Sequence, residues 1–194
     1  SFKKELMEAK QDVDIQLLAI PGIRHPAVTD FAREATERRF DALYLMDIEE
    51  RDEVNTFITS SLQVPSVTNT VNSFSARALD SSFAAAYFPD VVVNDPATRT
   101  NVKVPPSVVV LGAFGLNDAV AFPWFAPAGF TRGGLSEGAG GIPVLDVSKR
   151  LTSEDRDDVY EAGINPIAKF PAEGIVIFGQ KTLQQTRSAL DRIN

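Results

Sequence analysis

The sequence contains no cysteine and only one histidine, His25. Without thiols, the chain cannot form disulfides, use a cysteine nucleophile or build a zinc site from thiolates. One imidazole also excludes a metal site made of several histidines. His25 precedes Pro26, where a helix commonly begins, and no Gly-x-Ser-x-Gly motif accompanies it. We therefore expect a structural role for His25 and no hydrolytic triad.

Unbroken apolar stretches are also scarce. Between Val104 and Phe130 the only charged residue is Asp118, but several prolines interrupt this segment. A bilayer span needs about 20 unbroken apolar residues, and interruptions leave backbone groups unpaired in lipid. Residues 1–10 are charged and helix-like, without the apolar run of a targeting sequence. We expect no membrane partner.

Basic residues are in the minority, because 19 Lys and Arg stand against 26 Asp and Glu and give a net charge of −7. This balance argues against a surface that binds phosphate backbones, so no nucleic-acid partner is expected. Of the 194 residues, 44% are hydrophobic and 23% are charged, as in an average globular domain. A chain of this size can bury its own core.

Apolar runs bounded by turn residues predict buried β-strands. They cover residues 13–20, 41–48, 84–93, 142–147, 164–170 and 174–179. In the third run, Pro89 predicts a bulge or an edge position. Residues 95–100 are typical of a turn, and residues 101–104 of the returning strand of a hairpin.

Apolar residues at helical spacing predict several amphipathic helices. One begins at Pro26, one spans Val54, Phe57, Ile58 and Leu62, one follows Pro65, one runs from the capping pattern at Thr152 to Gly163, and one covers residues 182–194. Residues 107–115 are so apolar that periodicity leaves a helix and a buried strand open. Residues 121–141 are rich in Pro and Gly and predict a long irregular loop. The predicted fold class is α/β, with a mixed central β-sheet flanked by helices.

Three segments contain residue types that could support chemistry. The acids Asp47, Glu49, Glu50, Asp52 and Glu53 follow a predicted strand, where ligands of α/β sheets collect and carboxylates can bind Mg²⁺ or Ca²⁺. They match no ligand spacing, and acids before a helix commonly stabilise its positive end.

The glycine-rich loop from Gly133 to Gly141 lacks the Lys and Ser or Thr of a P-loop and leads into a strand, so a flexible loop is expected. Phe122, Trp124 and Phe125 could stack on bases or sugars, but such residues are more often core or interface residues. No catalytic, cofactor-binding or metal-binding residue and no cofactor is therefore predicted. The alternative hypothesis is an α/β nucleotide- or metal-binding enzyme that uses the Asp47–Glu53 acids or the Gly133–Gly141 loop.

Short motifs in a fixed order over residues 84–183 resemble the contractile tail sheath proteins of tailed bacteriophages, which are related to pyocin and type VI secretion sheaths. The motifs are Tyr87-Phe88-Pro89, Asp95-Pro96, Val104-Pro105-Pro106-Ser107, Gly112, Asn117-Asp118, Trp124, Ala126-Pro127-Ala128-Gly129, Gly163-Ile164-Asn165-Pro166-Ile167, Phe170-Pro171, Gly174 and Phe178-Gly179-Gln180-Lys181-Thr182-Leu183. Arg39-Phe40-Asp41 and the strand after it fit more loosely. Phe178 stands where the family commonly has Trp.

This resemblance implies a structural subunit without enzymatic activity. Such subunits assemble as helically stacked hexameric rings around a tail tube and contract when the baseplate triggers them, which drives the tube through the host envelope. The implied location is the virion, after assembly in the host cytoplasm. No linker is visible between the two halves, so the sequence leaves open whether residues 1–83 and 84–194 form one body or two; the preferred prediction is an α/β subdomain at 1–83 that abuts a sheath core subdomain at 84–183 and shares one sheet with it. Residues 184–194 then form a stub before a missing C-terminal domain, the N-terminal arm is also missing, and this fragment is expected to be monomeric.

Overall fold

A five-stranded mixed sheet runs through the middle of the computed structural model, which describes residues 12–138 and 141–193. Its order is β1-β2-β3-β7-β8, and only the β7–β8 pair is antiparallel. The strands are β1 (Leu17–Ala19), β2 (Leu43–Asp47), β3 (Ala84–Phe88), β7 (Ile164–Phe170) and β8 (Gly174–Ile177). The mixed sheet predicted from the apolar runs is therefore confirmed, while the prediction for residues 1–10 lies outside the described part of the chain.

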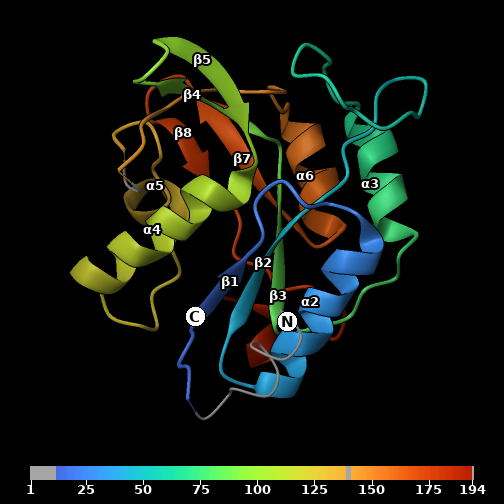
Figure 1. Ribbon diagram of the computed structural model, residues 1–194, viewed down its shortest axis with the longest axis vertical. Coiled ribbons are helices and arrows are strands. Elements are labelled where there is room, and N and C mark those ends of the chain that lie inside the picture. Colours follow the sequence, from blue (N-terminus) through green and yellow to red (C-terminus); the bar gives the residue numbers. More distant parts are fainter. Residues whose placement is uncertain (1–11, 139–140, 194) are drawn as a thin grey trace.

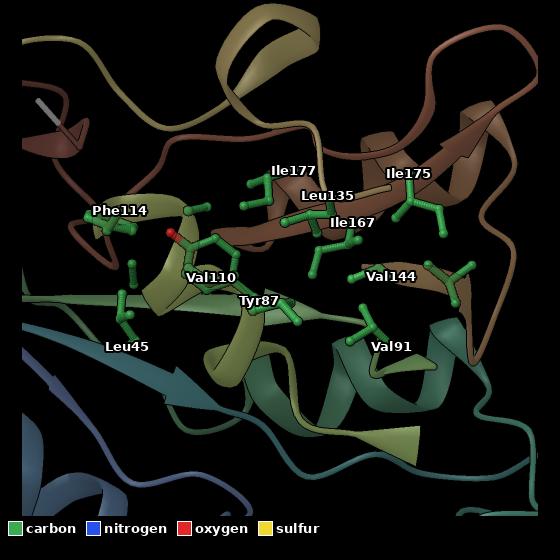
Figure 2. Close-up of a cluster of buried hydrophobic side chains, with 14 of the residues drawn as sticks. Leu45, Tyr87, Val91, Val110, Phe114, Leu135, Val144, Ile167, Ile175 and Ile177 are labelled. Atoms are coloured by element: carbon green, nitrogen blue, oxygen red, sulfur yellow. The ribbon is translucent and has the colours of Figure 1, made fainter. Parts of the chain in front are cut away.

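Helices and a second sheet cover the two faces of this sheet (Figure 1). Because side chains alternate along a strand, Tyr44 and Met46 of β2 pack on one side and Leu45 on the other. The first side meets α2 (Pro26–Arg39), α3 (Val67–Ser75) and α6 (Ser153–Glu161). The second meets α4 (Pro106–Val120) and the smaller sheet, and Figure 2 shows Leu45 and Tyr87 in this cluster with Val110 and Phe114 of α4. The chain thus has two buried cores, one on each face.

The smaller sheet is antiparallel and has the order β5-β4-β6. Its strands are β4 (Val91–Asp95), β5 (Thr100–Val104) and β6 (Val144–Val147). Asp95 fixes the turn between β4 and β5, because its backbone oxygen accepts from Arg99 N at 2.8 Å and its carboxylate accepts from the Thr98 hydroxyl at 2.8 Å. The predicted hairpin is confirmed.

Several predicted helices form where expected. The helix at Pro26, the helix after Pro65 and the helix that follows Thr152 are α2, α3 and α6. The alternative left open for residues 107–115 is resolved as α4, which Pro106 begins at a position that needs no backbone N–H. The predicted irregular loop contains one short helix, α5 (Gly129–Arg132).

The helix predicted through Val54, Phe57, Ile58 and Leu62 is wrong, since these residues form a loop. The Asp52 carboxylate accepts from the backbone N–H groups of Val54 at 3.1 Å and Thr56 at 2.8 Å. Such side-chain hydrogen bonds compete with the helical pattern. The apolar spacing therefore does not mark a buried face here.

The single strand predicted for residues 84–93 is also wrong. It divides into β3 and β4, which belong to different sheets and are separated by Pro89 and Asp90. Proline has no N–H to donate to a ladder, so the pairing of β3 cannot continue through Pro89.

The helix predicted for residues 182–194 is absent from residues 182–193, apart from the 3-10 turn η1 (Ala189–Asp191). The segment folds back on itself, because Thr182 N donates to Asp191 O at 2.9 Å and Ile193 N donates to Gln180 O at 2.8 Å. Ile193 is buried in the core beside α4. Tertiary burial of one apolar residue thus replaces the helical pattern.

Candidate functional site

The predicted acidic segment does not form one site, because its carboxylates have different partners in the fold. Asp47 and Glu50 are 1% and 4% exposed, Glu49 is half-buried, and Glu53 lies in an exposed turn. Within residues 12–138 and 141–193, no group of three or more His, Cys, Asp or Glu is arranged to hold a metal ion.

Asp47 ends β2 and joins three segments of the chain. Its Oδ1 accepts from the backbone N–H of Ser107 at 3.1 Å, and its Oδ2 accepts from the Ser107 hydroxyl at 2.7 Å and from Gly22 N at 3.1 Å. Burial raises the pKa of the Asp47 carboxyl above its ordinary value, and the bonds from Ser107 and Gly22 offset part of that rise. The carboxylate thereby caps the positive end of α4 and fixes the turn after β1.

Glu50 belongs to a second, buried charge cluster formed by Arg24, Glu50, Asp90 and Lys103. Arg24 Nη2 donates to Asp90 Oδ1 at 2.8 Å and Oδ2 at 2.7 Å, and its Nη1 donates to Ile48 O at 2.9 Å. Glu50 Oε1 accepts from Asp90 N at 3.1 Å, while its Oε2 accepts from Lys103 Nζ at 3.2 Å. Two carboxylates and two cations therefore connect the loops after β1, β2 and β3 to the hairpin.

The carboxyl of Asp90 is buried close to the Glu50 acid and to both cations of the cluster. Burial and the nearby charge of Glu50 raise the pKa of its carboxyl to about 7, although Arg24 and Lys103 act in the opposite direction. Buried charges of this kind need partners, and each acid here has a cation within 3.2 Å. The paired charges hold loops together and leave no free nucleophile or base.

The described part of the glycine-rich loop is paired with β8, so the expectation of a flexible loop is wrong for residues 133–136. Ile177 N donates to Gly133 O, and Leu135 N donates to Ile175 O, both at 2.8 Å. The Ser136 hydroxyl accepts from Ile175 N at 2.8 Å. These backbone groups are used within the protein and do not form a phosphate cradle, while residues 139–140 lie outside the described part of the chain.

His25 has the structural place predicted for it. It is the N-cap of α2, and its Nδ1 accepts from Ala27 N at 3.2 Å.

The predicted aromatic residues lie on the surface. Trp124 is 64% exposed, and Phe122 stacks on it with ring centroids 4.7 Å apart and planes 5° apart. Arg132 lies over the Phe125 ring at 4.4 Å. Sequence reasoning missed Arg132, as it missed Arg24, Asp90 and Lys103, because no local spacing connects them. The available signal is weak: Arg24, Glu50 and Asp90 all follow the carboxyl ends of adjacent parallel strands.

No helix in the described part of the chain has the length and hydropathy needed to cross a bilayer.

The chain is thus a packed α/β domain. Buried charges hold its loops together, and several aromatic rings are exposed on its surface. Part of the chain is similar in sequence to contractile tail sheath proteins. A segment of 100 residues, 52% of the chain, is 41% identical to the tail sheath protein of Vibrio phage KVP40 and 30% identical to that of Enterobacteria phage T4. The match spans 14% of each of those proteins. No protein-family model matches the chain.

Solved structures of contractile systems share the fold. A chain of the anti-feeding prophage helical sheath in the contracted state is 26% identical with a TM-score of 0.59, and 94% of the present chain aligns with 43% of it. A chain of the 6-fold symmetrised anti-feeding prophage baseplate gives a TM-score of 0.65 at 24% identity, over 97% of this chain and 44% of that one. A chain of the contracted PVC sheath complex, from an extracellular contractile injection system, gives 0.63 at 21% identity, over 93% and 43%. The predicted relationship to contractile sheaths is confirmed.

Proposed function

We propose that this chain is a domain of a contractile tail sheath subunit. The observation that carries the proposal is the 41% identity to a phage tail sheath protein, within a chain that aligns over 94% of its length with a solved sheath protein. Sheath subunits in this proposal assemble as helically stacked hexameric rings around a tail tube, contact the baseplate, and contract to drive the tube through the host envelope. The subunit would act in the virion after assembly in the host cytoplasm.

The structure supports this proposal through its rigidity. Two buried cores lie on the faces of one sheet, and the charge cluster fastens three loops to the hairpin. A lattice that contracts by sliding and rotating its subunits needs bodies that keep their shape while their interfaces change.

We also propose that the domain is not an enzyme and uses no cofactor. The support is that Asp47, Glu50 and the Gly133–Ser136 backbone are engaged in contacts within the fold. The division into 1–83, 84–183 and 184–194 stays a prediction, with β3 pairing to β2 on one side and to β7 on the other.

Electron microscopy of the sheath subunit that contains this domain tests the function. The expected result is tubes of constant width, and the 194-residue chain alone is expected to sediment as a monomer. A thermal-shift series with Mg²⁺ and nucleotides tests the rival enzyme. A stabilisation that rises with ligand concentration and is lost in Asp47→Ala, together with an absence of tubes, would overturn the proposal.

A further inference from the structure

The buried charge cluster contains more acids than cations once Asp47 is counted with it. Its three acids, Asp47, Glu50 and Asp90, are at most 5% exposed. Its two cations are Arg24 and Lys103, whose side chains are 22% and 11% exposed. The charges of all three acids act on the guanidinium of Arg24, so the five groups form one electrostatic unit. With every group ionised, this buried unit has one negative charge in excess.

The remaining neighbours of Asp90 do not neutralise this excess charge. The segment after β6 contributes a backbone group, because Ser148 N donates to Asp90 O at 2.8 Å. Asp146 of β6 is paired with Lys169 of β7 on the surface, at 3.0 Å. An uncompensated charge is costly in a buried site, so a proton is the simplest means of removing it. Burial and the charge of Glu50 raise the pKa of the Asp90 carboxyl to about 7, which makes Asp90 the acid that holds this proton.

An edge strand covers one side of the cluster. β5 pairs with β4 and, among the residues that the structure describes, with no other strand. Figure 1 shows β5 at the outer margin of the small sheet. Its Lys103 Nζ lies 3.2 Å from Glu50 Oε2 and 3.9 Å from Asp90 Oδ2. Its Val102 and Val104 are only partly buried against the core. The attachment of β5 to the loops therefore depends strongly on one lysine between two acids.

Separation of β5 from the loops changes the number of protons that the cluster holds. When Lys103 moves away, water reaches the carboxyls of Glu50 and Asp90, which Lys103 contacts in the closed form. Hydrated carboxyls are ionised at neutral pH, because water removes the desolvation that favours their neutral form. The proton held by Asp90 therefore leaves when β5 opens. The closed form binds one proton more than the open form.

We infer that β5 is a proton-sensitive arm, which closes on the charge cluster with uptake of one proton and opens more often as the pH rises. Linkage sets the sign, because an equilibrium that releases a proton is favoured by a higher pH. One proton gives at most about a tenfold rise of the opening equilibrium per pH unit, and the rise ends once Asp90 is ionised in both forms. The arm is a property of the domain itself, so this inference goes beyond the proposed function and does not depend on it.

Amide hydrogen exchange of the 194-residue chain, followed by NMR, tests the arm. The protection factor, which is the intrinsic exchange rate divided by the observed rate, removes the pH dependence of the exchange chemistry. From about pH 5 to about pH 7, protection in the β4–β5 ladder should fall severalfold per unit and stay below that of the β7–β8 ladder. Equal protection in the two ladders at each pH would mean that β5 opens only by global unfolding, which overturns the arm. Protection of β5 that does not change with pH would overturn the proton uptake.

Two variants assign the effect to the cluster. Asp90→Asn removes the titrating carboxyl at nearly constant size, and it should abolish the pH dependence of β5 protection. Lys103→Met keeps the aliphatic stem but removes the cation, so it should lower β5 protection severalfold near neutral pH and leave the β7–β8 ladder protected. Lys169→Met, which breaks the exposed ion pair with Asp146, is the matched control and should leave β5 protection unchanged. A pH dependence that persists in Asp90→Asn, or equal effects of the two methionine substitutions, would overturn the inference.

Discussion

Arg24 and Asp90 lie 66 positions apart in the sequence, yet one guanidinium nitrogen of Arg24 is within 2.8 Å of both Asp90 carboxylate oxygens. Glu50 approaches the same aspartate from a third segment and accepts from its backbone N–H. Because the two acids share one buried region, the proton affinity of Asp90 depends on the charge of Glu50. This dependence gives the fold a measurable response to pH.

Glu50→Gln should flatten the pH dependence of stability. In the folded chain the pKa of Asp90 is raised from 3.8 to about 7, so between these values the folded state binds more protons than the unfolded state. The contribution of Asp90 to the free energy of unfolding therefore falls as the pH rises through this range. Burial continues to raise the Asp90 pKa in this variant, but the amide removes the second cause, the charge of Glu50, and keeps an oxygen for the Asp90 N–H.

The measurement is the urea midpoint of the parent chain and of Glu50→Gln from pH 4 to pH 8, at intervals of about half a pH unit. The slope of the midpoint against pH should be smaller for Glu50→Gln. Glu53→Gln, an exposed change in the same loop, is the matched control and should leave the slope unchanged. An identical slope for Glu50→Gln and the parent chain would contradict the assignment.

Asp47→Ala should destabilise the fold by about 3 kcal/mol, because the backbone N–H groups of Ser107 and Gly22 lose their acceptor. Asp52→Ala, which removes a half-buried acid of the same segment whose hydrogen bonds are exposed, should cost clearly less. The measurement is the free energy of unfolding in urea, with and without millimolar-range Mg²⁺. If Mg²⁺ stabilised the parent chain but not Asp47→Ala, the structural role assigned to Asp47 would be wrong.

Gly133→Ala should cost about 1–3 kcal/mol, because the added Cβ would lie 2.6 Å from the Ile177 backbone oxygen and 2.9 Å from Gly129 N. Its neighbour provides the control, since a Cβ on Gly134 meets nothing within 4 Å. Chemical denaturation of both variants should give a lowered midpoint for Gly133→Ala only. Equal midpoints would indicate that residues 133–136 are not held against β8.

Thr152→Ala should lower stability by about 1 kcal/mol through loss of a helix cap. The Thr152 hydroxyl accepts from Asp155 N at 3.1 Å, and the Asp155 carboxylate accepts in return from Thr152 N at 2.8 Å. Ser153→Ala, at the first residue of α6, should change little. Thermal unfolding followed by circular dichroism distinguishes the two, and equal melting temperatures would argue against the cap.

Signals that act within a few residues were sufficient to predict part of the fold. The capping box at Thr152 and the proline that begins α2 are local, and both helices form where these signals lie. The hairpin after β4 is local in the same sense, because the Asp95 side chain and the residues after it fix the turn.

Features that depend on distant contacts could not be predicted. The spacing of Val54, Phe57 and Leu62 is helical, but these residues are exposed and pack against no core. The Asp52 carboxylate accepts hydrogen bonds from the backbone of this loop, and local spacing does not reveal either fact. Likewise, Arg24, Glu50, Asp90 and Lys103 come from four segments whose proximity is set by sheet order. The acidic segment was identified as notable, but its partners were not.

The order of the strands also determines how the domain responds to mechanical force. β3 lies between β2 and β7 in the large sheet, β4 lies between β5 and β6 in the small one, and only Pro89 and Asp90 separate them. A pull on the hairpin is therefore transmitted along the main chain to the middle of the large sheet, at a crossing that Arg24 and Glu50 brace from two other loops. We therefore expect the two sheets to move together when tension is applied to the hairpin.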